Sequence, residues 1–346
     1  MKYFLCILSL LTMLMIPVRA DTLIAPEAPD DVKSLIQSDD INLLERIRYL
    51  FAEGIRSAQP TVAPTAKLCG YLLCAMLLFA LTFEIKGNYG RFWELSGVFA
   101  ISTLLLSNTG SMLRLGIETV QQITDYSKLL LPVLTAALAA QGGSVSATAL
   151  YSVTALFSSI LSGLMTKILF PMISVFLVFA TISAATEDEL LRRLRDLTKQ
   201  IMGWSLKVLL YGFTGFISIT GIISGTADQM AIKAAKLTIS GMVPVVGGIL
   251  SDASETILVG AGMVKSTIGV YGMLAVLAIT IVPFLKVGIS YLFLKLTCTA
   301  GSAYAPKTLV GVLTDFTTAM GFVLAITGSV CLIQLISTVC FLKGMS

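Results

Sequence analysis

Residues 241–265 read GMVPVVGGILSDASETILVGAGMVK, two glycine-rich apolar runs on either side of a short polar island. The island carries two carboxylates, Asp252 and Glu255, in a chain whose mean hydropathy is +0.89. Each apolar flank is shorter than the ~20 residues that a membrane-spanning helix requires. The stretch is therefore interpreted either as two half-spans that meet at a polar, re-entrant tip, or as one helix with both carboxylates on one face. Both interpretations place the island in protein or water, because lipid does not tolerate it.

The composition of the whole chain indicates a membrane protein. Of its 346 residues, 56% are hydrophobic and 13% are charged, about half the charged fraction of a soluble domain. There is no histidine, which excludes Ser-His catalysis and the histidine-ligated zinc sites of metalloproteases. The six cysteines form no CxxC pair, so the sequence predicts neither a metal nor a cofactor. No basic-aromatic patch suggests nucleic-acid binding, and the chain is predicted not to be an enzyme.

The N-terminal part of the chain divides into a leader and a polar segment. Residues 1–20 combine Lys2, an apolar run and a small residue, Ala20, at the end, which is typical of a cleavable signal peptide; an uncleaved anchor is the alternative. Residues 21–66 carry eight acidic and four basic side chains up to position 56, and are expected outside the cell membrane. Within them, residues 42–56 have the apolar spacing of an amphipathic helix.

The rest of the chain, 67–343, is predicted to be an all-α transmembrane domain with seven to nine crossings. Basic residues between the first two spans, and the arginine-rich helix predicted over 186–200, are typical of cytoplasmic segments. Both can be cytoplasmic only if the short apolar run 129–140 also crosses, a point that its length leaves open. The expected spans are 67–85, 92–113, 147–165, 168–185, 203–224, 267–284, 287–300 and 318–341.

The polar island is the candidate functional site. Asp252 and Glu255 lie three residues apart and would share a helix face, where they could form a cation or proton site or line an aqueous path. The alternative is an exposed turn, in which these acids cap the following helix. The candidate polar residues of the channel or re-entrant segment are Ser251, Asp252, Ser254, Glu255, Lys265 and Lys286. Lys286 is placed in a short connector between two spans, from which it either snorkels to the interface or pairs with an acid.

The stretch PVVGGILSDASETILVGAGMVKSTIGVYG, with Pro283-Phe284-Leu285-Lys286 after it, resembles the stage III sporulation protein AE family. The matching positions include Pro244, Gly247, Asp252, Lys265 and Gly269. Weaker similarity reaches back through FPMISVFLVFATISA, residues 170–184, so that the resemblance covers about 65–341. No single residue of the pattern identifies a chemistry.

The resemblance implies a multi-pass protein of the bacterial cell membrane in an endospore former, placed in the mother-cell membrane around the forespore. Its implied partners are other stage III A-operon membrane proteins, together with the lipid bilayer. The expected function is a non-enzymatic subunit of a secretion-like channel complex between mother cell and forespore. A stand-alone permease that uses Asp252, Glu255 and Lys286 for coupling is the alternative. A purely structural scaffold would not need the carboxylates at all.

Overall fold

The computed structural model describes residues 43–83, 90–140, 144–219 and 267–344, and these residues are helical throughout apart from short turns. The chain runs through α3 (Leu43–Ala58), a 3-10 turn (Gln59–Thr61), α4 (Val62–Phe83) and α5 (Gly90–Ala140). It continues through α6 (Ser144–Leu164), a π-helical turn (Met165–Leu169), α7 (Phe170–Thr186), α8 (Glu189–Ile219), α11 (Thr267–Gly301) and α12 (Lys307–Gly344). The all-α prediction is confirmed.

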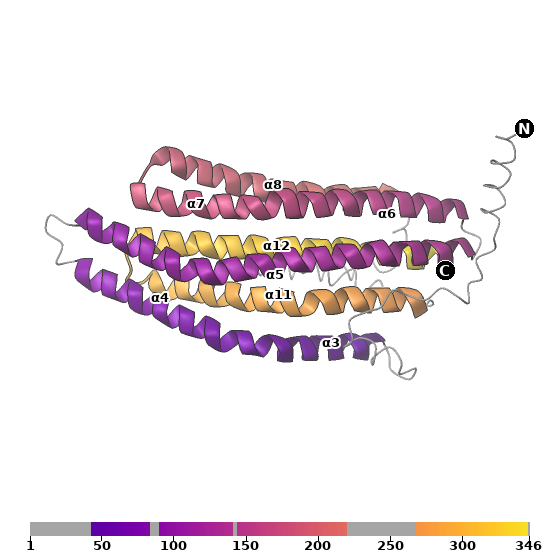
Figure 1. Cartoon of the computed structure of the whole chain (residues 1–346), viewed down its shortest axis with the longest axis horizontal. Coiled ribbons are helices and arrows are strands. Elements are labelled where there is room, and N and C mark those ends of the chain that lie inside the picture. The colour runs from indigo at the N-terminus through magenta and orange to yellow at the C-terminus, as the bar shows by residue number, and fades with distance from the viewer. Residues whose placement is uncertain (1–42, 84–89, 141–143, 220–266, 345–346) are drawn as a thin grey trace, which may run out of the picture.

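The helices lie along a common axis as an elongated bundle with α12 at its centre (Figure 1). Five helical segments of the described chain are long and apolar enough to cross a membrane. In the segment from α12, 94% of the most apolar window is buried, against 22–50% in the other four. The centre of the bundle is therefore protein on all sides, and the surrounding helices provide its outer surface.

The central helix carries many hydroxyl side chains, which it satisfies locally. On α12, Thr317, Thr327, Ser329, Ser337 and Thr338 each donate to a carbonyl oxygen one turn earlier, over 2.7–3.0 Å. A buried hydroxyl without a partner would cost free energy, and the preceding turn of the same helix supplies an acceptor. The helix can therefore be buried without matching polar groups on its neighbours.

Three connections lie at the same end of the bundle (Figure 1), which we call the hairpin end and define by the helix termini Phe83, Gly90, Thr186, Glu189, Gly301 and Lys307. The turn between α7 and α8 is closed by Glu187, whose φ of 58° is left-handed and whose N–H donates to the carbonyl of Ser183 over 3.0 Å. Asp188 then caps α8 by accepting from the N–H of Leu190 over 2.8 Å. The arginine-rich start of α8 thus lies at the same end as the connection between α4 and α5.

Several expected breaks between spans are absent, because the helices continue through them. The polar residues between 113 and 129 lie inside α5, a single helix of 51 residues, so 129–140 is its continuation. The expected spans 147–165 and 168–185 join through the π-helical turn, and 203–219 continues α8, the helix expected over 186–200. Lys286 lies inside α11, which runs 35 residues through Pro283. The expected range of seven to nine crossings counted these pieces separately and stays a prediction.

The helices continue because their polar or proline residues do not prevent helical hydrogen bonding. Pro171 is at the second position of α7, directly after the π-helical turn, where the bonding pattern has already shifted. Pro132 and Pro283 each remove one backbone donor inside a long helix, a loss that packing in a helical bundle tolerates. Polar side chains such as Gln121 and Asp125 face outward on α5. Polar residues in these helices therefore indicate that the helix surface is exposed there, and they do not indicate that the helix ends.

Candidate functional site

A polar recess at the hairpin end is the most developed candidate site among the described residues. It has a volume of about 390 Å³ and lies between α8, the start of α12 and the connection from α11. Its polar lining is Arg195, Ser302, Lys307, Thr314 and Asp315. Three of these five side chains are ionisable, and Asp315 is the one charged residue among the buried side chains of the described residues.

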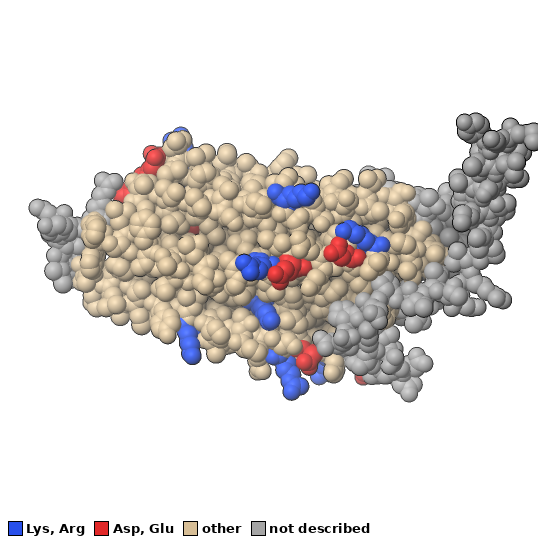
Figure 2. Space-filling view, viewed as in Figure 1, with Lys and Arg blue, Asp and Glu red and all other residues tan. Residues whose placement is uncertain are grey.

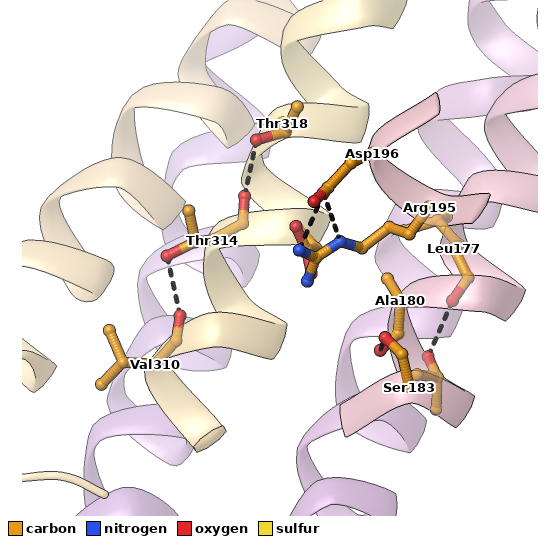
Figure 3. Close-up of polar contacts among 10 residues, drawn as sticks. Leu177, Ala180, Ser183, Arg195, Asp196, Val310, Thr314 and Thr318 are labelled. Atoms are coloured by element: carbon orange, nitrogen blue, oxygen red, sulfur yellow. Dashed lines mark hydrogen bonds and ion pairs between the residues drawn. The ribbon is translucent and has the colours of Figure 1, made fainter. Parts of the chain in front are cut away.

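The recess is built around the guanidinium of Arg195, which contacts two carboxylates (Figure 3). Its Nη1 lies 3.1 Å from Oδ2 of Asp315 on α12, and its Nη2 lies 2.8 Å from Oδ1 of the neighbouring Asp196. Nε of Arg195 also donates to the same Asp196 oxygen over 2.9 Å. The guanidinium therefore joins the first turns of α8 to the central helix, across 120 residues of sequence.

The two partners of the ion pair between Arg195 and Asp315 are buried to different extents. Asp315 is 8% exposed and the side chain of Arg195 is 22% exposed. Partial burial disfavours the charged guanidinium, but the carboxylates of Asp315 and Asp196 outweigh that effect, so the pKa of Arg195 lies above its ordinary value. Arg195 therefore stays charged at every physiological pH, and it supplies the opposite charge that a buried carboxylate at position 315 requires.

Four further hydrogen bonds fix the helices that surround the recess. The hydroxyl of Thr308 donates to a carboxylate oxygen of Glu94, and the hydroxyl of Tyr304 donates to the carbonyl of Leu73 over 3.1 Å. Cys298 and Thr314 lie 3.0 Å apart, Sγ to Oγ1, and join α11 to α12. Nε1 of Trp93 donates to Thr82 between α5 and α4. The hairpin end is thus held by directional contacts as well as by packing.

Deeper in the bundle, several buried polar side chains have no hydrogen-bond partner among the described residues. They lie on the core-facing sides of three packed helices, and they are Ser102, Asn108, Thr109, Tyr126 and Ser127 on α5, Ser290 on α11 and Gln334 on α12. A buried polar group without a partner costs about 1–3 kcal/mol and is commonly satisfied by internal water. These groups give the interior a hydration capacity that an apolar packing core would lack.

The residues predicted from the sequence are mostly not part of this arrangement. Ser251, Asp252, Ser254, Glu255 and Lys265 lie outside the described residues. Lys286 is half-buried in the middle part of α11 and forms no ion pair with another described residue. The proposed pairing of Lys286 with an acid of the island therefore stays a prediction.

The sequence contains a signal for the recess. Asp315 is the only charged residue between Lys307 and Lys343, and that whole run is helical. An isolated carboxylate in an apolar helix needs a partner of opposite charge. Which of the chain's 24 basic residues supplies it depends on the packing of α8 against α12, which the sequence does not specify.

The described residues contain no group of three or more Cys, Asp or Glu side chains that could hold a metal ion. The recess and its edge bring together two carboxylates, Asp196 and Asp315, and two cations, Arg195 and Lys307. Its chemistry is therefore that of ion pairing and polar recognition.

Comparisons with known proteins place this architecture in a family. No solved structure matches the chain. The stage III sporulation protein AE of Bacillus subtilis (strain 168) is 28% identical over 246 residues, a match that covers 69% of this chain and 59% of that protein. This chain thus spans less than two thirds of that relative's length. The family model for stage III sporulation protein AE matches residues 61–343. Because that match runs from the start of α4 to the end of α12, the chain belongs to the stage III sporulation protein AE family.

Proposed function

We propose that this chain is a non-enzymatic, integral-membrane subunit of a transport complex between mother cell and forespore. The observation that carries the proposal is the family match over the described bundle from α4 to α12, in a structure with five segments that suit a membrane. The complex itself is inferred from the family. Its partners would be the other membrane proteins of the stage III A operon, and its location the mother-cell membrane around the forespore.

The distribution of charged helices supports a subunit that meets partners on both sides of a membrane. The amphipathic helix α3 and the arginine-rich start of α8 lie at opposite ends of the bundle (Figure 1). At the start of α8, Arg192 and Arg193 are exposed, whereas Arg195 is engaged in the recess. The exposed pair is available to a partner with an acidic surface, and Arg195 is reserved for the fold.

Charge reversal of the exposed arginines tests the proposal. In an endospore-forming host that carries the tagged full-length chain, R192E/R193E is expected to reduce recovery of the other operon proteins at least tenfold and to block forespore development. The matched control is Lys128→Glu on α5, an exposed lysine far from the hairpin end, which should leave recovery unchanged. Normal recovery and normal development in R192E/R193E would contradict a partner surface at this end.

The alternative, a stand-alone permease coupled through Asp252, Glu255 and Lys286, has a separate test. Asp252→Asn and Glu255→Gln are made singly, and complex assembly and forespore development are measured for each. Normal assembly with normal development removes a coupling role for the carboxylates. Transport by the purified protein alone in vesicles would instead favour the permease.

A further inference from the structure

Exposed apolar side chains are concentrated on the half of the bundle next to the hairpin end. On α5, Phe92, Phe99 and Leu106 are 55–68% exposed, and all three lie in the first third of that helix. Between residues 107 and 137, the one large hydrophobic side chain that is exposed is Leu129. A surface of this kind is expected to face lipid in a membrane protein, whereas the remainder of α5 has the surface of a soluble bundle.

The neighbouring helices show this contrast to different degrees. On α11, the exposed large hydrophobic residues are Leu292 and Leu296, both within ten residues of Gly301 at the hairpin end. On α7, Val175, Val178 and Ile182 are exposed, but α6, which continues this helix beyond Lys167, also exposes Leu156 and Ile160, each at 63%. Figure 2 shows this half of the visible face as a largely uncharged expanse, bounded near mid-length by separated basic side chains.

Each of the five outer helical segments carries a basic residue where this expanse ends, and α11 carries a further exposed lysine, Lys295, within the expanse, six residues from Gly301. The five are Lys67 on α4, Arg114 on α5, Lys167 in the π-helical turn, Lys207 on α8 and Lys286 on α11. Lys286 is half-buried and the other four are exposed. None of the five forms an ion pair with another described residue. We call these five residues the basic ring.

The basic ring lies about one bilayer thickness from the hairpin end. Its members are 15 (Lys286) to 24 (Arg114) residues from the helix terminus at that end. At 1.5 Å per residue this separation is about 23–36 Å along the axis, and the hydrocarbon core of a bilayer is ~30 Å thick. All five positions carry a cation, and the acid closest to any of them on the same helix, among the described residues, is Glu118, one turn beyond Arg114.

We propose that the bilayer surrounds only the half of the bundle between the hairpin end and the basic ring, and that the ring binds anionic phospholipid headgroups of the leaflet farther from the hairpin end. Phosphate oxygens accept hydrogen bonds from ammonium and guanidinium groups. Such basic residues at a membrane surface interact favourably with anionic lipids. Their aliphatic stems can lie along the apolar belt while the charges reach the headgroups.

This placement leaves the other half of the bundle outside the bilayer. Helix α5 has 51 residues and is about 76 Å long, more than twice the hydrocarbon thickness. Its second part, with the exposed ion pair of Asp125 and Lys128 at 2.8 Å, then projects into water together with α3. On α8 the charges of residues 189–199 interrupt the apolar belt beside the Arg195 recess, so water and headgroups reach the recess from the hairpin end.

The first test uses one helix as its own control. In full-length protein whose six cysteines have been replaced, Leu104→Cys and Leu129→Cys are made singly, and each is labelled with an environment-sensitive fluorophore. Both positions are exposed on α5, at 36% and 61%. In vesicles, the label at position 104 should be strongly quenched by nitroxide-bearing lipids, and the label at 129 should be quenched at least fivefold less. Equal quenching, or stronger quenching at 129, would overturn the placement of the bilayer.

The second test measures lipid selectivity at the ring. Spin-labelled phosphatidylglycerol and phosphatidylcholine compete for the protein surface in mixed vesicles. The wild-type protein should prefer the anionic lipid by about fivefold, and K67Q/R114Q/K167Q/K207Q/K286Q should bring the ratio close to one. The control R48Q/R56Q/K128Q removes cations outside the ring and should leave the preference intact. If the fivefold variant does not fold, K167Q and K207Q are measured singly. An unchanged preference in the ring variants would overturn the lipid assignment.

Discussion

At the scale of single residues, the contact between Arg195 and Asp315 is the one ion pair of the described residues in which both side chains are largely buried. The charge that remains after one partner is removed has different surroundings in the two cases. Without Asp315, Arg195 keeps Asp196 at 2.8 Å and 22% of its side-chain surface in solvent. Without Arg195, the carboxylate of Asp315 stays largely buried, and no other described residue forms an ion pair with it. A buried charge without its partner is the more costly outcome.

We therefore expect unequal effects of the two neutral substitutions. Arg195→Gln should lower the free energy of unfolding by about 3 kcal/mol, and Asp315→Asn by about 1 kcal/mol. The double variant should be more stable than Arg195→Gln alone, because it no longer buries a lone carboxylate. Thermal unfolding of the purified protein in detergent, analysed as a double-mutant cycle, measures the coupling. Equal destabilisation by both single variants would show that Lys199, whose charge already acts on Asp315, can take the place of Arg195 as its partner.

At the scale of elements, glycine permits α5 to approach two other helices closely. A Cβ atom at Gly116 would lie 2.8 Å from Cγ1 of Val323 on α12 and 3.0 Å from Cε1 of Phe170 on α7. Gly110, six residues earlier on the same helix, has nothing within 4 Å of a Cβ position. The two glycines thus separate the effect of close packing from the effect of helix propensity.

The matched alanine variants should move stability in opposite directions. Gly116→Ala should destabilise the protein by about 1–2 kcal/mol, because the overpacking cost exceeds the gain in helix propensity. Gly110→Ala should stabilise it by about 0.5–1 kcal/mol, since that gain is unopposed there. The midpoint of thermal unfolding in detergent reports both changes. Stabilisation by both alanines would mean that α5 is not closely packed at position 116.

At the scale of the whole molecule, the position of the connections decides the topology. The turn between α7 and α8 and the connection between α11 and α12 lie at one end. The sequence independently indicates a cytoplasmic location for the arginine-rich segment at that turn. The two connections should therefore share one side of the membrane, although 113 residues separate Asp188 from Gly301 in the chain.

Single cysteines in the two connections test this arrangement. Asp188→Cys and Ser302→Cys, both at exposed positions, are introduced into the chain without its native cysteines. Both should react with a membrane-impermeant thiol reagent only when the cytoplasmic side is accessible, as in inverted membrane vesicles. Reaction of the two cysteines from opposite sides would contradict the bundle topology.

The sequence by itself determined the class of the protein and the character of its parts. The described part of the apolar run 67–85 and the whole of 318–341 lie within helices, and the amphipathic pattern of 42–56 corresponds closely to α3 (Leu43–Ala58). These features are local: hydrophobicity and helical period are properties of consecutive residues. The resemblance of residues 244–272 and 283–286 to the family is confirmed by the family match.

The tertiary structure decided which helices are continuous and which residues meet. Whether the polar part of α5 ends a helix depends on what surrounds it, since exposed polar side chains leave the backbone hydrogen bonds intact. The partner of Asp315 depends on packing across 120 residues, and the basic ring comes from five segments that only the bundle aligns. Periodicity in a sequence reports on one helix at a time, whereas ion pairs and membrane depth are relations between helices, fixed by how their surfaces pack.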